Sequence, residues 1–300
     1  MIRAFDEIIE TAKKKGPKII AVAVAQDIEV LSAVNDAKDL GIANAILVGD
    51  KDEIAEAAKD CGVDINKFAV IDIKEKNEAC RKAVELVSTG KAHIVMKGLV
   101  DTSLILKAVL DEKIGLRTGN VLSHVAIFDV PGYDRLFYVT DAAMNIAPNL
   151  NQKKQIIENA VQVANALGND NPKVAVLAAV EKVNPKMQAT LDAAELIRMN
   201  EAGELMGCTL GGPFALDNAV SVEASKHKGI THPVAGYADI LMVPAIEAGN
   251  MLYKSMVFFA RAKNAGIIVG AKAPIVLTSR ADSNEAKLNS IAIGALMADK

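Results

Sequence analysis

Short apolar runs alternate with amphipathic segments along most of the chain, and this pattern predicts an α/β fold. Runs such as "KIIAVAVA" and "AHIVMKG" are mostly apolar, whereas the segments after them carry apolar residues at helical spacing. Buried strands are predicted at residues 18–25, 44–49, 68–73 and 92–98, with helices at 28–40, from 52, at 77–88 and at 102–110. Such alternation is typical of βαβ units around a mainly parallel sheet.

The middle of the chain departs from this pattern and then returns to it. Residues 121–130 and 135–141 are joined by a Pro-Gly turn at 131–132 and predict an antiparallel pair of strands. The alternation resumes with helices at 152–167, 187–199 and 247–262 and strands at 173–179, 239–244 and 266–271. A last strand at 274–277 and a helix face at 288–296 follow. We expect two α/β lobes flanking a cleft.

Two smaller signals concern glycine and proline. "GGPFALD" (residues 211–217) is interpreted as the approach to a helix, with Pro213 in the first turn. Gly249 falls inside a helical pattern, where glycine costs stability relative to alanine. Gly249 therefore predicts a close approach of packing or of a ligand.

Composition supports a core of small aliphatic side chains. Apolar residues make up 51% of the 300 residues, aromatic residues only 4%, and Trp is absent. Sheets covered by helices on both faces have this character. The formal net charge of −3 gives no basic footprint for nucleic acid, so we expect no nucleic-acid partner.

The N-terminal segment and the cysteines point to a cytoplasmic protein. "MIRAFDEIIETAKKK" is an amphipathic helix with acids rather than a signal peptide, and no apolar run approaches about 18 residues. We expect no membrane span. Cys61, Cys80 and Cys208 are too widely spaced for a zinc site or a disulfide framework, and no His-based metal motif is present.

The junction between the last strand and the last helix carries the strongest chemical signal. Asp282 or Ser283 can cap the helix, with Glu285 completing something close to a capping box. Ser279 and Arg280 lie before that cap, where the strand ends. Ligands bind at the carboxyl ends of strands in open α/β sheets. Ser279 and Arg280 are therefore candidates for binding negative charge.

Other strand ends offer further candidates, each with a plain structural alternative. In "VMKGLVDTS", Lys97 and the predicted helix start at Thr102 and Ser103 could bind a phosphate. The structural alternative is an ordinary loop between strand and helix in which Thr or Ser caps the helix. Asp141 and Asn145 follow a strand and suit either a ligand or a turn. There is no P-loop, no Gly-x-Gly-x-x-Gly after a strand and no Gly-x-Ser-x-Gly elbow.

Together these segments resemble the phosphate acetyltransferase/phosphate butyryltransferase family over essentially the whole chain. The resemblance is carried by "AVAVAQD", "VMKGLV", "GLRTG", "SHVAIF", "NPKM", "GN" followed by "YK", and "LTSRADS", in that order. It implies an isocitrate/isopropylmalate-dehydrogenase-like fold in which the C-terminal segment returns to the first domain. With the boundary that the alternation places near 142–150, we expect domains at residues 1–144 plus 274–300 and 145–273. It also implies a homodimer or larger homo-oligomer.

The reaction implied by the resemblance is acyl-CoA plus phosphate giving acyl phosphate plus coenzyme A, in acid-forming fermentation. Coenzyme A is then a substrate, and no bound cofactor or metal is expected. "SRADS" resembles the butyryl branch, which favours butanoyl-CoA, with acetyl-CoA as the alternative. Two other classes stay open. A dehydrogenase on this scaffold lacks its metal-binding aspartates and nucleotide loop here, and a non-catalytic coenzyme-A-binding protein is the other possibility.

Site roles follow from the resemblance residue by residue. Ser279 matches the serine that assists the thiol and the transition state, and Arg280 matches the phosphate-binding arginine. The family's catalytic Asp, seven residues after the serine, is replaced here by Ala286, so Glu285 is our preferred base and Asp282 the alternative. Substrate and phosphate contacts are assigned to Asp141, Asn145, Thr102 and Ser103. Coenzyme A contacts are assigned to Arg117, to Lys254 and to Lys107, where the family commonly has Arg.

Overall fold

Packing divides the chain into two units, each built on its own set of strands. The computed structural model describes residues 1–278 and 282–298. We call residues Phe5–Asn120 with Ala265–Lys300 the terminal unit, and Met1–Ala4 with Val121–Asn264 the middle unit. The domain bounds that the sequence suggested, 1–144 plus 274–300 and 145–273, stay a prediction.

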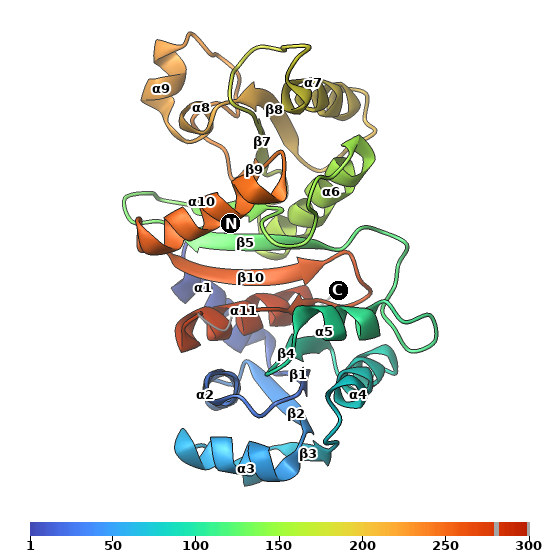
Figure 1. The fold of residues 1–300 in the computed structure, drawn as a ribbon. Helices are drawn as coiled ribbons and strands as arrows, with labels where there is room; N and C mark the ends of the chain where they lie inside the picture. The colour runs from blue at the N-terminus through green and yellow to red at the C-terminus, as the bar shows by residue number, and fades with distance from the viewer. Residues whose placement is uncertain (279–281, 299–300) are drawn as a thin grey trace. The chain divides into compact units, whose positions relative to one another are not determined.

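The terminal unit is an α/β layer structure (Figure 1). Its elements are α1 (Phe5–Lys15), β1 (Lys18–Ala23), α2 (Ile28–Asp39), β2 (Ala43–Gly49), α3 (Lys51–Asp60), η1 (Ile65–Lys67), β3 (Ala69–Asp72), α4 (Lys76–Ser88), β4 (Ile94–Lys97), α5 (Thr102–Val109), β10 (Lys263–Val269), β11 (Ile275–Val276) and α11 (Asn284–Met297). The strand order is β3-β2-β1-β4-β11-β10, parallel throughout except for β10 against β11.

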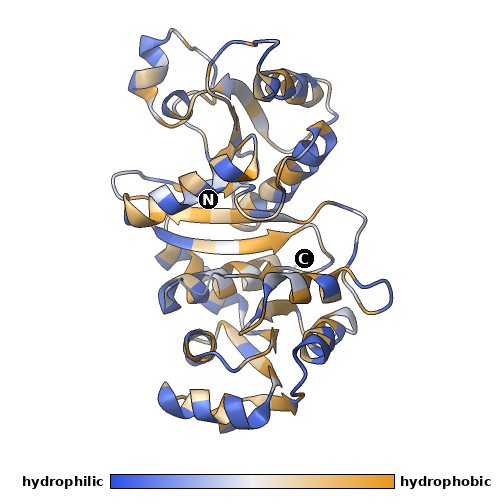
Figure 2. Ribbon diagram, in the orientation of Figure 1, coloured by the Kyte–Doolittle hydropathy of each residue, from blue (hydrophilic) through white to orange (hydrophobic). Residues whose placement is uncertain are grey.

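Helices cover both faces of this sheet. α1, α2 and α11 pack on one another over one face, and α4 and α5 pack together over the other (Figure 1). The strands between them are apolar in Figure 2, while the helices are apolar on one side and polar on the other. Asp27, Asp50 and Ser283 cap α2, α3 and α11 with their side chains. The helix starts are thus fixed locally, and burial of the apolar faces does the rest.

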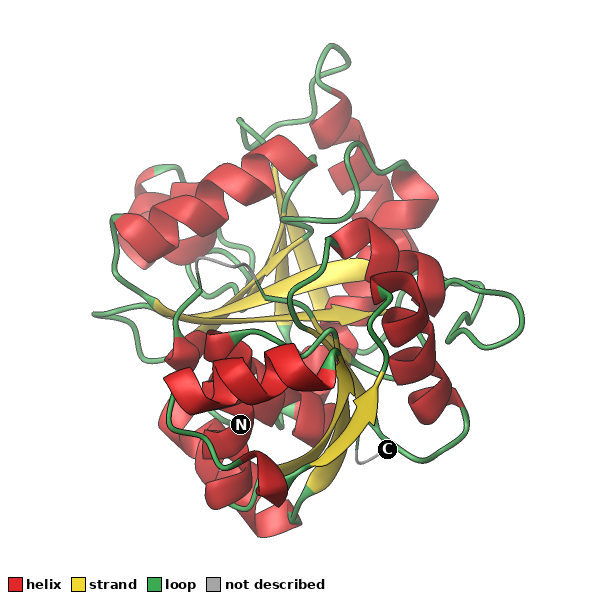
Figure 3. Ribbon diagram, turned by 60° about the horizontal axis from the view of Figure 1, so that its bottom comes forward, coloured by secondary structure: helices red, strands yellow, loops and turns green. Residues whose placement is uncertain are grey.

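The middle unit is also an α/β layer structure, and its first two strands are antiparallel. Its elements are β5 (Ser123–Asp129), β6 (Leu136–Thr140), α6 (Leu150–Ala166), β7 (Lys173–Leu177), α7 (Gln188–Glu201), β8 (Thr209–Phe214), α8 (Leu216–Val220), α9 (Val222–His227), β9 (Ile240–Met242) and α10 (Ile246–Phe258). Strand order is β5-β6-β9-β7-β8, and only β5 against β6 is antiparallel. Figure 3 shows red helices flanking the yellow strands.

These elements confirm the predicted fold class and the antiparallel pair. The turn between β5 and β6 uses Gly132 with a positive φ of 90°, as the Pro-Gly signal suggested. Within the described residues, no helix has the length and apolar character needed to cross a membrane.

The expectation for Pro213 is wrong. Pro213 lies inside β8 rather than in the first turn of a helix, and the peptide bond before it is cis. β8 is the last strand in its order, and an edge strand tolerates a residue without an N–H donor. α8 begins three residues later, at Leu216.

Candidate active site

Three strand ends meet at one edge of the terminal unit's sheet. β4 is parallel to β1, with Ala23 opposite Lys97, and parallel to β11, with Val276 opposite Met96. The carboxyl ends of β1, β4 and β11 therefore lie side by side. This is the edge at which open α/β sheets bind ligands. The start of α5 at Thr102 and Ser103 therefore lies at the same edge as the end of β11.

The loop after β4 is packed tightly against the end of β1. Gly98 donates its N–H to the carbonyl of Ala23 at 2.9 Å, and Leu99 donates to the carbonyl of Val24 at 2.8 Å. A Cβ at position 98 would overlap both carbonyl oxygens, so only glycine fits. Val24 has a φ of 57°, an uncommon left-handed conformation for a β-branched residue. Strain of this kind clusters at functional sites.

Lys97 holds the same loop in place through hydrogen bonds to its backbone. Its side chain is buried, and its ammonium donates to the carbonyls of Gly98 and Val100, both at 3.1 Å. α5 then begins after Asp101, whose side chain makes no capping hydrogen bond. Thr102 and Ser103 are thus the first two helical residues rather than caps. Their N–H groups belong to a helix start that favours an anion.

The β11–α11 junction is described on both sides of residues 279–281. Ser279 and Arg280 lie outside the described residues. Ser283 is the N-cap of α11 and accepts from the N–H of Ala286 at 3.2 Å, as one of our two capping alternatives expected. The prediction of a capping box is wrong, because the third helical residue after the Ser283 cap is Ala286 rather than Glu285.

The two candidate bases differ in their surroundings. Glu285 is exposed in the first turn of α11, and Asp282 is half-buried just before the cap. The Lys287 ammonium donates to the backbone carbonyl of Asp282. Ala286, at the position where the resemblance implies a catalytic Asp, is buried. The directions of Glu285 and position 286 differ by about 100° around the helix.

Lys107 and Arg117 lie in the terminal unit, away from the strand ends. Lys107 is exposed in the last turn of α5. Arg117 is exposed and its guanidinium lies 3.4 Å from Glu112, a surface pair that stabilises little. Its loop is held by the backbone N–H of Lys272, which donates to the carbonyl of Leu116 at 2.9 Å. Both positions leave the cation available to a solvent-borne phosphate.

In the middle unit, Asp141 and Asn145 come together directly after β6. One Asp141 carboxylate oxygen accepts from the N–H groups of Ala143 and Met144 at 2.8 and 2.9 Å. The other accepts from the Asn145 amide at 2.6 Å, and that amide also donates to the Leu122 carbonyl at 2.9 Å. Asp141 is only 2% exposed, so its carboxylate builds the turn. A ligand role for the pair stays a prediction.

α10 packs against this turn. A Cβ at Gly249 would overlap the carbonyl oxygen of Asp141 and lie 2.9 Å from the Cα of Ala142, which confirms the close approach predicted for that glycine. Lys254, five residues later, is half-buried with its ammonium 5.1 Å from the centre of the Tyr253 ring.

Gln26 is a candidate that we did not single out from the sequence. It follows β1 at the same edge as Lys97 and is only 7% exposed. Its amide nitrogen donates to Glu53 at 3.0 Å, and its carbonyl oxygen is buried without a hydrogen-bond partner in the described structure. A polar residue directly after a buried strand was the available signal.

Comparison with known proteins identifies the family. The family model described as "Phosphate acetyl/butaryl transferase" matches residues 4–81 and 74–295. The chain is 54% identical over 298 residues to the phosphate butyryltransferase of Clostridium acetobutylicum (strain ATCC 824), covering 99% of both chains. It is 46% identical over 293 residues to the phosphate acetyltransferase of Thermotoga maritima, covering 98% of this chain and 99% of the other.

A solved structure agrees with these matches. The branched-chain phosphotransacylase from Enterococcus faecalis V583 superposes with a TM-score of 0.83 at 36% identity, covering 94% of this chain and 99% of that one. The chain therefore belongs to the phosphate acetyl/butyryl transferase family, and the resemblance read from its motifs is confirmed.

Proposed function

We propose that this protein is a phosphate butyryltransferase that interconverts butanoyl-CoA plus phosphate with butanoyl phosphate plus coenzyme A. The observation that carries the proposal is the 54% identity to a phosphate butyryltransferase along the full length of both chains. A match this complete includes every strand end described above. Acyl-CoA and inorganic phosphate are the substrates, and the enzyme is an acyltransferase.

The chemistry requires a thiol to attack an acyl phosphate, or the reverse. A free thiol with a pKa near 8.5 is only a few per cent ionised at neutral pH, so a carboxylate base assists the attack. We assign this role to Glu285, with Asp282 as the alternative. Ser279 donates a hydrogen bond to the developing negative charge, and Arg280 neutralises the phosphate. Both substrates bind together, so orientation supplies much of the rate.

The geometry of the terminal unit supports this assignment. The β4–α5 loop with Thr102 and Ser103 and the segment following β11 are on paired parallel strands. A phosphate held at the start of α5 would lie at the edge where Ser279 and Arg280 follow β11. Lys107, Arg117 and Lys254 are assigned to the phosphates of coenzyme A, and Asp141 and Asn145 to substrate positioning.

The experiment that tests the function is phosphate-dependent release of free thiol from butanoyl-CoA, followed with a thiol reagent. The wild type should turn over, and Ser279→Ala should lower kcat by roughly 10²–10³-fold. No turnover of any acyl-CoA by the wild type would instead favour a non-catalytic coenzyme-A-binding protein. The absence of the family Asp at position 286 is the observation that favours that alternative.

A second candidate activity is the same reaction on acetyl-CoA. It is favoured by the 46% identity to a phosphate acetyltransferase. Each methylene of the acyl chain contributes only about 1–3 kcal/mol to discrimination, so a few pocket side chains decide the outcome. A comparison of kcat/KM for acetyl-, butanoyl- and branched acyl-CoA distinguishes the two, and a preference for acetyl-CoA would contradict the main proposal.

We also propose a homodimer or larger homo-oligomer in the cytoplasm, acting in fermentation. Exposed apolar side chains on α10 support self-association, since Met251, Phe258 and Phe259 are 65%, 68% and 88% exposed. Isolated apolar side chains are ordinary on a surface, but three along one helix and its C-cap suggest a contact. Light scattering after size exclusion tests the oligomer, and Phe258→Ser with Phe259→Ser should yield the monomer.

A further inference from the structure

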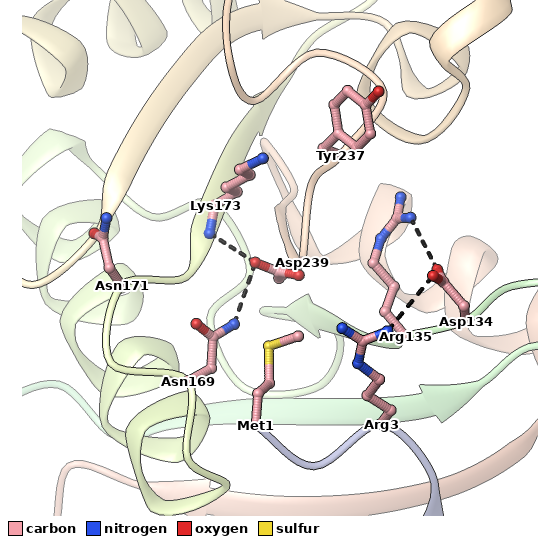
Figure 4. Close-up of a pocket in the computed structure, with 9 residues that line it drawn as sticks. All are labelled: Met1, Arg3, Asp134, Arg135, Asn169, Asn171, Lys173, Tyr237 and Asp239. Atoms are coloured by element: carbon pink, nitrogen blue, oxygen red, sulfur yellow. Dashed lines mark hydrogen bonds and ion pairs between the residues drawn. The ribbon is translucent and has the colours of Figure 1, made fainter.

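A cavity of about 350 Å³ lies in the middle unit, away from every residue assigned above. Among its lining residues are Arg3, Asp134, Arg135, Asn169, Lys173 and Tyr237 (Figure 4). Arg135 directly precedes β6, Lys173 opens β7, and Asp239, also in the lining, directly precedes β9. These three strands are parallel, so the cavity is at their amino ends. Asp141 follows β6 at the opposite end.

Arg135 is held rigidly in this cavity. Its guanidinium donates to the carbonyls of Gly236 and Ala238, both at 3.2 Å, and lies 4.9 Å from the centre of the Phe137 ring. The Arg135 side chain is only 16% exposed. A fixed planar fork loses little entropy when it binds an anion. Arg135 is therefore preorganised.

Asp134 is the carboxylate that faces both guanidinium groups. Its oxygens lie 3.7 Å from Arg3 and 3.8 Å from Arg135, as the dashed lines of Figure 4 show. The Asp134 side chain is 81% exposed, so these long contacts are weak in water. An incoming dianion can take the place of Asp134 between the two arginines.

Lys173 and Tyr237 supply a third cation and a flat apolar surface. The Lys173 ammonium lies 4.7 Å from the centre of the Tyr237 ring, and within the described residues it has no carboxylate within ion-pair distance. Tyr237 is 49% exposed, so part of its ring is open to solvent. An aromatic ring can stack there, beside a cation that attracts a phosphate.

The remaining acid, Asp239, belongs to the wall of the cavity. It is 8% exposed, and one oxygen accepts from the backbone N–H of Lys173 at 2.8 Å and from the Asn169 amide at 3.2 Å. Asp239 thus fixes the start of β7 instead of pairing with the Lys173 ammonium. Three cationic side chains then face two carboxylates, one of them displaceable.

We propose that this cavity binds a small phosphomonoester that carries a flat ring, of nucleoside-monophosphate size. The phosphate lies between Arg3, Arg135 and Lys173, and the ring packs on Tyr237. Ligand sites begin at about 300 Å³, so a mononucleotide is within the range of this cavity. β6 and β9 run from the cavity toward Asp141 and Val243 at the opposite ends of these strands.

The test measures direct binding of AMP to the full-length protein by isothermal titration calorimetry. We expect the wild type to bind at millimolar concentrations or below. Removal of two charge-assisted contacts in Arg3→Gln with Lys173→Gln should weaken binding by about ten-fold or more. Tyr237→Ala should weaken it as well. Arg198→Gln, which alters an exposed arginine of α7 with two carboxylate partners, is the matched control and should bind normally.

Two outcomes would overturn the proposal. The first is an absence of AMP binding to the wild type. The second is binding that coenzyme A displaces and the cavity variants leave unchanged, because AMP would then occupy the coenzyme A site. Binding is read without turnover, so an inactive enzyme would contradict the proposed function and leave this result intact.

Discussion

Gly249 of α10 lies directly against the carbonyl oxygen of Asp141, so closely that a methyl group at position 249 would overlap it. Two segments more than a hundred residues apart thereby fix each other. The Asp141 turn cannot move away freely, since its carboxylate is already committed to the N–H groups of Ala143 and Met144. The helix must therefore shift if the glycine gains a side chain.

Gly249→Ala should for this reason reduce the free energy of unfolding by about 1–3 kcal/mol, the usual cost of overpacking. Gly294→Ala in α11 is the matched control, because its Cβ would meet side chains rather than backbone, with Val276 at 3.2 Å and Ile94 at 3.5 Å. Alanine also gains about 1 kcal/mol of helix propensity there. Urea denaturation of both variants measures the difference. Equal stability of the two would contradict the packing argument.

The Asp141–Asn145 pair provides a second stability prediction. Asp141→Asn places an amide nitrogen opposite the Asn145 amide that now donates at 2.6 Å, so two donors would face each other in a buried turn. An unsatisfied buried group costs about 1–3 kcal/mol. Asn145→Ala should reduce that penalty when added to Asp141→Asn, and a double-mutant cycle by urea denaturation measures the coupling. Additive effects would show that the contact does not couple the residues.

Removal of one partner of the buried ion pair in the middle unit should destabilise the protein strongly, whereas replacement of both partners by apolar side chains should destabilise it little. Lys153 of α6 and Asp192 of α7 are 2.6 Å apart with side chains 6% and 10% exposed, and Gln188 donates to the second Asp192 oxygen at 2.8 Å. Lys153→Met alone leaves a buried carboxylate and should cost about 3–5 kcal/mol. Lys153→Met with Asp192→Leu should recover most of that loss, as measured by thermal unfolding. A double variant no better than the single one would contradict this.

The free energy of unfolding is expected to depend on pH because of His232. Burial lowers the pKa of His232 below its ordinary value, and the opposing effect of Glu201 is smaller. The unfolded chain then binds a proton that the folded chain does not, so the free energy of unfolding falls as pH drops below about 6.5. Above that pH His232 is neutral in both states and contributes no pH dependence.

His232→Asn should flatten this part of the stability profile between pH 7 and the lowered pKa. Urea denaturation across that range, for the wild type and the variant, is the measurement. His227→Asn, at the exposed end of α9, is the control for replacement of a surface histidine. An unchanged slope in His232→Asn would assign the acid sensitivity to other groups.

Much of the fold follows from local patterns, because strands buried on both faces and capped helices leave clear signals. The antiparallel pair β5–β6 and the close approach at Gly249 were predictable for that reason. Pro213 was not, because proline suits both a helix start and an edge strand, and only the strand order decides.

The candidate sites were predictable to different degrees. Asp141 and Asn145 are four residues apart, so their contact follows from a turn. Arg135 reaches carbonyls about a hundred residues away, at Gly236 and Ala238, and no periodicity marks such a contact. The cavity around Arg135 was missed because its lining comes from four separate segments, three of them at the amino ends of strands, where we sought no ligand.

The identity of the catalytic base is open to a direct test at the start of α11. Glu285 is exposed in the first turn, while the family's position for the Asp is occupied by the buried Ala286. If Glu285 removes the thiol proton, Glu285→Gln should lower kcat by about 10²–10⁴-fold with a small change in KM, and Asp282→Asn should have a lesser effect. Glu29→Gln, in the first turn of α2, controls for lost charge at a helix start.

The reverse order of effects would transfer the role to Asp282, which lies directly before the cap of α11. Substitution of Ala286 by Asp separates the two cases further. A carboxylate there should restore activity to Glu285→Gln if position 286 faces the thiol, since the base would return to the family's own location. If Ala286→Asp only destabilises the protein, as an unpaired buried charge does, position 286 does not face the thiol. The base of this protein is then Glu285, the residue beside it. Steady-state kinetics and urea denaturation distinguish these outcomes when applied to Glu285→Gln, Asp282→Asn, Ala286→Asp and the double variant Glu285→Gln with Ala286→Asp.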